Sequence, residues 1–247
     1  MAGHSKFKNI QHRKGAQDKK RAKVFTRLIK ELAVAARSGT DPAANPRLRT
    51  ALAGCRAANM PKDNVERVLK RAEGGEGEIY EEIRYEGYGT GGTAFIVEAL
   101  TDNRNRTASE VRAAFNKFGG SLGETGSVSF MFDKVGQIIF DASVGDADTV
   151  FGAALEAGAD NVESDEELHI ITTNPEDFNA VRDALDTAFG APQEAQLTWI
   201  AQNRVDVEEG HAQTLLKFMD TLDDNEDVQN IAFNFEISDE IMAKLES

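Results

Sequence analysis

A glycine-rich break, Glu73-Gly74-Gly75-Glu76-Gly77, separates two parts of the chain whose apolar residues repeat with different periods. Before the break, apolar residues recur every three to four positions, which is the period of an amphipathic helix. Beyond the break, short runs alternate or are wholly apolar, as in strands, and are interleaved with helical stretches. The chain is therefore predicted to combine an N-terminal helical domain with α+β structure.

Three helices are predicted before the break, over residues 17–37, from Pro46 onward, and over residues 62–72. Asn45-Pro46 supplies a capping side chain and a first-turn proline for the second helix. One arc of the first helix is apolar and is expected to pack; it comprises Val24, Phe25, Leu28, Ile29, Leu32, Ala35 and Ala36. The opposite arc presents cations, which gives this small bundle a basic surface.

Beyond the break, residues 79–87 and 94–97 are predicted to form a hairpin, followed by a helix over 107–118 and a strand over 128–132. Residues 136–201 then have the order strand, helix, strand, strand, helix, strand, which is the ferredoxin-like βαββαβ unit. Its second helix is predicted to begin at Asn174-Pro175. A helix over 208–222, a strand over 231–235 and a short terminal helix complete the chain.

Charge is distributed very unevenly between these parts. The net charge of −14 is the sum of +13 over residues 1–72 and −27 over residues 73–247. Such asymmetry is typical of a protein with a polyanionic partner. We expect the basic N-terminal part to approach the phosphates of a nucleic acid, while the acidic remainder is repelled by them.

The basic character is strongest in residues 1–30, which hold ten Lys and Arg and one acidic residue, Asp18. A flexible tail kept basic for solubility is one interpretation, but such surfaces usually mix both signs. The favoured interpretation is an arm, continued by a cationic helix face, that neutralises phosphates. Its candidate nucleic-acid-binding residues are His4, Lys6, Lys8, His12, Arg13, Lys14, Lys19, Lys20, Arg21, Lys23, Arg27 and Lys30.

A second candidate lies in the segment 101–107, which joins a predicted strand to a helix. Asn103, Arg104, Asn105 and Arg106 lie in this segment. They are compatible with a capped turn, and equally with a loop that contacts phosphates or bases, since Arg and Asn make bidentate contacts to bases. The sequence alone does not decide between these two interpretations.

Other functional classes find little support in the residue pattern. Gly87-Tyr88-Gly89-Thr90-Gly91-Gly92 fits a dinucleotide-binding motif, but a strand follows it instead of a helix, so we expect a hairpin turn. Cys55 is the only cysteine, and the four histidines lack metal-ligand spacing. We therefore expect no catalytic site, metal, cofactor or small-molecule substrate, no membrane span, and a cytoplasmic location.

Long sequence blocks resemble the YebC/PmpR family, which includes a mitochondrial translational activator. These blocks are Met1–Lys6, His12–Lys14, Asp41-Pro42, Asn45–Arg49, Asn59–Asn64, Leu100–Thr107, Gly119–Gly123 and Gly126–Val128. The chain departs from the family pattern at Phe7, where Trp is usual, and at Thr90, where Pro is usual. Phe in place of Trp slightly weakens any role of residue 7 in stacking on bases. Thr in place of Pro at residue 90 affects only the predicted hairpin.

The resemblance implies a multidomain α+β fold: a three-helix domain and two α+β domains, the third of them ferredoxin-like and inserted into the second. The expected boundaries are residues 1–77, residues 78–133 with 204–247, and residues 134–203. The resemblance also implies a DNA-binding transcriptional regulator. The alternative for this family is a ribosome-associated factor that binds ribosomal RNA and assists translation through proline-rich stretches.

Overall fold

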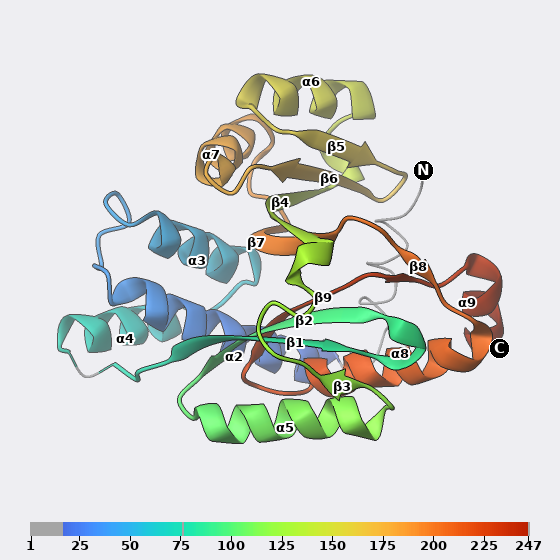
Figure 1. Cartoon of the computed structure of the whole chain (residues 1–247). Coiled ribbons are helices and arrows are strands. Elements are labelled where there is room, and N and C mark those ends of the chain that lie inside the picture. Colours follow the sequence, from blue (N-terminus) through green and yellow to red (C-terminus); the bar gives the residue numbers. More distant parts are fainter. Residues whose placement is uncertain (1–16, 76, 247) are drawn as a thin grey trace. The chain divides into compact units, whose positions relative to one another are not determined.

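The computed structural model describes residues 17–75 and 77–246 (Figure 1). It forms two compact units. One combines the N-terminal part up to Ile79 with Lys134–Thr198, and the other combines Tyr80–Asp133 with Trp199–Ser247. The mixed helix and sheet, multidomain organisation is confirmed, while the three domain boundaries given above stay a prediction.

The three predicted N-terminal helices are present as α2 (Gln17–Ala36), α3 (Pro46–Ala57) and α4 (Lys62–Glu73). Their shared core consists of buried Leu32, Ala35, Ala36, Leu48, Ala51, Cys55 and Met60. Val24 was expected in this core but is 42% exposed. The apolar residues of α2 that contact the core begin only at Phe25, so Val24 lies beyond its edge.

Asn45 joins two of these helices. Its Oδ1 accepts from the backbone N of Leu48 at 3.0 Å and so caps α3, as predicted. Its Nδ2 donates to the carbonyl oxygens of Ala35 at 2.7 Å and Gly39 at 2.8 Å. One buried side chain therefore links the last turn of α2, the loop residue Gly39 and the first turn of α3.

The second unit is built on a four-stranded sheet in the order β3-β1-β2-β9. These strands span Ser121–Leu122, Glu81–Tyr88, Ala94–Thr101 and Val228–Phe233. Helices α5 (Arg104–Lys117) and α8 (Glu209–Asp223) cover one face. Phe95 of β2 packs edge-on against Phe115 of α5 and Phe218 of α8, which ties both helices to the sheet.

A buried glutamate organises the other face of this sheet. Glu86, 1% exposed, accepts from the backbone N atoms of Val128 at 3.0 Å and Ser129 at 2.9 Å. These bonds hold a 3-10 turn over Ser129–Met131, so the strand predicted over 128–132 is wrong. Burial alone would raise the pKa of Glu86, but these amide donors outweigh it and hold the pKa below its ordinary value.

Residues 132–201 form the predicted βαββαβ unit. Its strands are β4 (Phe132–Asp141), β5 (Asn161–Ser164), β6 (Leu168–Thr173) and β7 (Glu194–Ala201), in the order β5-β6-β4-β7. Its helices are α6 (Ala147–Ala157) and α7 (Phe178–Phe189). The prediction that α7 begins at Pro175 is wrong, because Asn174 Oδ1 accepts from the backbone N of Glu176 and holds a turn there instead.

The strand predicted over 231–235 is divided between Val228–Phe233 and Phe235–Glu236, and the short strand Val205–Asp206 was not predicted. Val205–Asp206 (β8) pairs in parallel with Phe235–Glu236 (β10), and Asp239–Glu246 forms the terminal helix α9. Helix α5 begins at Arg104, three residues before the predicted position, because Asn103 caps it. Among the described residues, no helix is long and apolar enough to cross a membrane.

Candidate nucleic-acid interface

The predicted cationic face of α2 is only partly described. His4, Lys6, Lys8, His12, Arg13 and Lys14 lie outside the described residues. Lys19, Lys20 and Arg21 belong to the helix, but their side chains lie outside the described part of the chain. The structure therefore leaves these nine candidates as predictions.

The three remaining candidates on α2 are less accessible than expected. Lys23 and Arg27 are half-buried, and Lys30 is 8% exposed. Each of the three has an interaction within the chain. The expectation that Lys30 lies on an open cationic face is wrong: its long apolar stem allows a lysine to be covered along most of its length.

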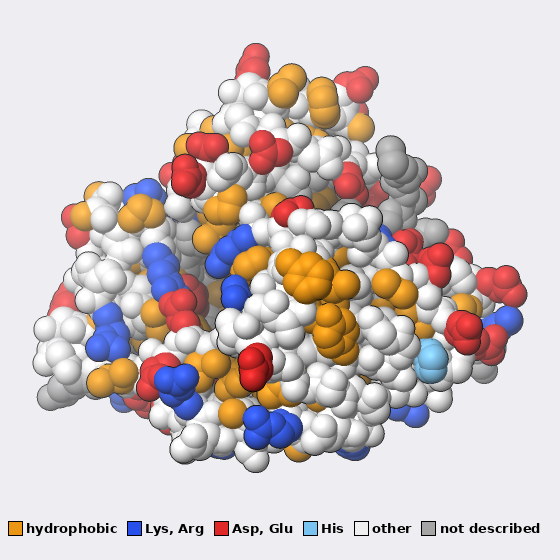
Figure 2. Space-filling model, in the orientation of Figure 1, with side chains coloured by type: hydrophobic (Ala, Val, Ile, Leu, Met, Phe, Trp, Pro, Cys, Tyr) orange, Lys and Arg blue, Asp and Glu red, His pale blue; other side chains and the backbone are white. Residues whose placement is uncertain are grey.

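Exposed cations are found instead at the end of α3 and along α4, where the sequence analysis proposed no site. They are Arg56, Lys62, Arg67, Lys70 and Arg71. Val65, Val68, Leu69 and Ala72 turn the opposite side of α4 toward the helical core. A helical wheel of residues 62–73 would have found this face, since Arg67, Lys70 and Arg71 are spaced i, i+3, i+4. Figure 2 shows basic side chains over α3 and α4.

Not every arginine of the helical part is available to a ligand. Arg47 forms a two-pronged ion pair with Glu31, with Nε–Oε1 at 2.7 Å and Nη2–Oε2 at 3.1 Å. Arg49 Nη1 donates to the carbonyl oxygens of Pro42 at 2.8 Å and Ala43 at 3.3 Å. These two arginines of the Asn45–Arg49 block hold the turn between α2 and α3.

The segment 101–107 is a capped turn with a buried acceptor at its centre. Asn103 Oδ1 accepts from the backbone N of Arg106 at 3.1 Å. Asp227, 3% exposed, lies at the start of β9 and accepts through Oδ2 from three donors. These are Arg106 Nη2 at 2.7 Å, Thr107 Oγ1 at 2.7 Å and Thr101 Oγ1 at 3.1 Å.

This network assigns different roles to the four candidates of the second loop. Asn103 caps α5, and Arg106 is held by Asp227 and by Asp102, whose Oδ1 lies 2.8 Å from Nη2. Arg104 projects outward, 68% exposed, with Glu81 at 3.4 Å, and Asn105 is exposed. A surface pair of this kind contributes little to stability. Of the four, Arg104 and Asn105 are the residues that could meet a ligand.

The glycine motif at 87–92 is the turn of a hairpin. Strands β1 and β2 pair in antiparallel register from Glu81–Thr101 to Tyr88–Ala94. Gly91 and Gly92 have φ angles of 71° and 75°, in the region that favours glycine, within the short turn that links the strands. The hairpin prediction is confirmed, and no helix follows that could hold a pyrophosphate.

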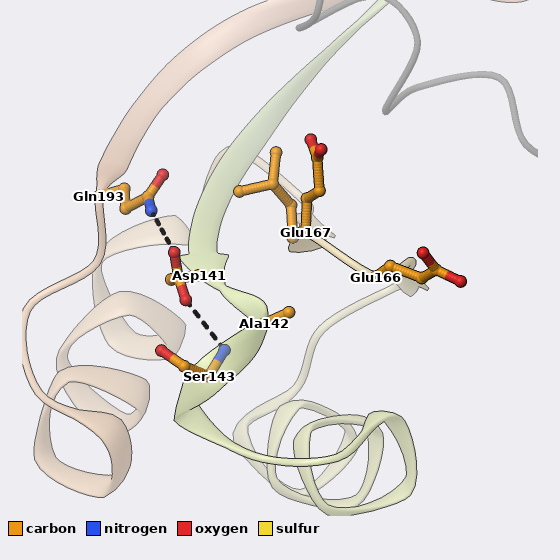
Figure 3. Close-up of a pocket in the computed structure, with 7 residues that line it drawn as sticks. Asp141, Ala142, Ser143, Glu166, Glu167 and Gln193 are labelled. Carbon is orange, nitrogen blue, oxygen red and sulfur yellow. Dashed lines mark hydrogen bonds between the residues drawn. The ribbon is translucent and has the colours of Figure 1, made fainter.

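An open hollow in the βαββαβ unit is lined by Asp141, Ala142, Ser143, Glu166, Glu167, Leu168 and Gln193 and encloses about 700 Å³. Asp141 accepts from the backbone N of Ser143 at 2.9 Å and from Gln193 Nε2 at 3.2 Å, while Glu166 and Glu167 point away from it (Figure 3). The hydrogen bonds from Ser143 hold the pKa of Asp141 below its ordinary value. Among the described residues that line the hollow there are three acids and no Lys, Arg or His.

His169 and Cys55 are both buried within the fold. His169, 2% exposed, contacts Ser164 Oγ through Nδ1 at 2.7 Å and donates from Nε2 to the Gly145 carbonyl at 3.0 Å. Burial raises the pKa of the Cys55 thiol to about 11, which keeps it protonated and unreactive. Within residues 17–75 and 77–246, no group of three or more His, Cys, Asp or Glu side chains could hold a metal ion.

Comparison with known proteins covers nearly the whole chain. Residues 5–75 match the family model described as the TACO1/YebC protein N-terminal domain, and residues 80–235 match the one described as the TACO1/YebC second and third domain. The chain is also similar to a conserved hypothetical protein from Aquifex aeolicus of known crystal structure. The two are 44% identical, with a TM-score of 0.86 over 94% of this chain and 97% of the other. The chain therefore belongs to the TACO1/YebC family.

Proposed function

We propose that this protein is a nucleic-acid-binding regulator of gene expression, and that its target is duplex DNA. The observation that carries this proposal is the segregation of charge, +13 over residues 1–72 against −27 over the remainder. A strongly basic segment gains affinity for phosphates by releasing counterions from the nucleic acid. The name of the family model that matches residues 80–235 refers to transcription regulation, which favours DNA as the target.

The exposed cations of α3 and α4 extend the proposed surface beyond the N-terminal arm. They project from helices with a packed core, so the backbone that carries them is already ordered before a nucleic acid binds. The arm and the side chains of Lys19, Lys20 and Arg21 would add further contacts. We place this activity in the cytoplasm, without an enzymatic step or a cofactor.

Binding is tested by fluorescence anisotropy of the full chain with a labelled 25-base-pair duplex over a range of salt concentrations. We expect neutralisation of three cations of α4 (R67A/K70A/R71A) to weaken binding. The slope of log K against log salt concentration should also become less negative, by about 0.9 for each phosphate that is no longer neutralised. The matched control neutralises three exposed cations of the second unit (R112A/K117A/K217A) and should have a smaller effect. Equal weakening in both variants would show that total charge alone governs binding and would refute the proposed surface.

The kind of nucleic acid is tested separately. A transcriptional regulator should bind a promoter fragment more tightly than a scrambled duplex of the same length and composition. Equal affinity for the two, together with sedimentation of the protein with ribosomes at physiological salt, would overturn DNA as the target. That result would favour the ribosomal RNA alternative.

A further inference from the structure

Helix α6 has a stripe of exposed residues on the side that faces away from the core of the βαββαβ unit. Its inner side is formed by Val150 and Ala154, both fully buried in the core of the βαββαβ unit. The outer stripe comprises Asp148, Phe151, Gly152, Leu155 and Glu156, spaced i, i+3, i+4, i+7, i+8 and all exposed. Phe151 and Leu155 are 51% and 62% exposed, on an eleven-residue helix.

The two apolar side chains lie one turn apart and are bounded by acids. Asp148 and Glu156 lie at either end of the stripe, and Figure 2 shows hydrophobic side chains over α6 with acidic ones beside them. Between them, Gly152 leaves open space: an added Cβ would have no atom within 4 Å. A partner could therefore place an apolar side chain in the gap between Phe151 and Leu155.

The surroundings of this stripe determine what kind of partner it suits. Residues 134–198 contain fourteen acidic residues and two basic ones, Lys134 and Arg182. Arg182 is 4% exposed and is held by Asp183, with Nη2–Oδ1 at 2.6 Å. The surface of this part of the protein is therefore negative, which repels phosphates and attracts cations.

From these observations we infer that the outer face of α6 binds a basic amphipathic segment of a partner protein. Apolar side chains of the partner would cover Phe151 and Leu155, and its Lys or Arg residues would meet Asp148 and Glu156. Aromatic and aliphatic anchors within a charged rim are the usual composition of such interfaces. A second copy of this chain is disfavoured, because a symmetric contact would bring the acids of both α6 helices together.

This binding would be separate from the nucleic-acid surface, so the two can fail independently. The probe is a fluorescent synthetic helix with two leucines at i, i+4 and lysines on both sides of them, titrated with the full chain at 150 mM salt. We expect F151S/L155S to weaken binding by roughly tenfold, as is typical for removal of paired anchors. The matched control L197S removes another exposed leucine of the same unit, 42% exposed, and should change affinity less than about twofold.

Charge is tested with D148N/E156Q, which should weaken binding and flatten its salt dependence. The same peptide with glutamates in place of its lysines should not bind. Unchanged affinity in F151S/L155S would overturn the inference, because the peptide would then be held by negative charge alone. Circular dichroism should show both double variants melting close to the native chain, since the substituted residues are exposed.

Two further outcomes would assign the face to another occupant and overturn the inference. The first is a concentration-dependent dimer in light scattering that F151S/L155S abolishes, which would identify a second copy. The second is tighter peptide binding after deletion of residues 1–15, which would identify the chain's own basic segment as the ligand.

Discussion

Replacement of Asp227 tests whether the carboxylate beneath the 101–107 turn holds this part of the second unit together. Asp227→Ala removes the carboxylate that accepts from the hydroxyls of Thr101 and Thr107, both fully buried, and leaves Thr107 with the Asn103 carbonyl at 3.1 Å and the Thr101 hydroxyl at 2.8 Å. It also removes one of the two carboxylates that pair with Arg106, so that only Asp102 remains. Breaking a buried ion pair by removing one partner typically costs about 3–5 kcal/mol. Arg106 is 41% exposed and partly screened by water, so we expect the lower end of that range, about 3 kcal/mol.

Guanidinium denaturation of the full chain, followed by circular dichroism, measures this destabilisation. Asp227→Asn keeps an acceptor of the same shape but removes the charge, so it should cost less, about 1–2 kcal/mol. Glu124→Ala, which removes an exposed acid from the same unit, is the control and should change stability by less than about 0.5 kcal/mol. If the free energy of unfolding of Asp227→Ala lies within about 1 kcal/mol of that of the native chain, the network contributes no more than an ordinary hydrogen bond and the role assigned to Asp227 is refuted.

Two further substitutions test other buried contacts. Asn45→Asp should destabilise the chain by about 1–3 kcal/mol, because it removes the amide donor to the carbonyl oxygens of Ala35 and Gly39. Asp would serve equally well if residue 45 were only a helix cap. A melting temperature of Asn45→Asp equal to that of the native chain would therefore refute the role of Asn45 in joining the two helices. The pKa of Glu86 is lower in the folded chain than its ordinary 4.5, so its contribution to stability is present above that pH and is lost as pH falls through the lowered pKa. Urea melts between pH 7 and pH 3 should therefore show the advantage of the native chain over Glu86→Gln shrinking with acidity; an advantage that grows would contradict the assigned direction.

Local sequence signals predicted the elements that depend on near neighbours. The cap at Asn45-Pro46, the hairpin glycines and the βαββαβ order all follow from residues close together in the chain, and each is present in the structure. The family resemblance extended this to the multidomain organisation.

Long-range contacts explain what the sequence did not reveal. The turn at Ser129–Met131 depends on Glu86, more than forty residues earlier, and this partner cannot be inferred from the spacing of Val128 and Phe132. Arg106 has the residue type and position of a phosphate ligand, but its guanidinium is bound by Asp227, 121 positions away.

The helical wheel has a related limit when it is used to find a ligand surface. The cations of α2 stand out in the sequence because residues 1–30 hold ten Lys and Arg with one acidic residue, whereas α4 also contains Asp63, Glu66 and Glu73. The covering of Lys30 depends on tertiary packing, which the wheel of a single helix does not contain.

The proposed segregation of charge is tested most directly by exchanging charge between the basic helical part of the chain and the acidic βαββαβ unit. R67E/K70E/R71E places acids on the basic face, and D148K/E156K/D160K places bases on the acidic unit, where all three substituted acids are exposed. Affinity for a labelled duplex is then measured at a fixed physiological salt concentration. If residues 1–72 lead the approach, the first variant should lose most of its binding and the second should change little. Affinity changes of similar size and opposite sign in the two variants would show that only net charge matters and would contradict a directed nucleic-acid interface.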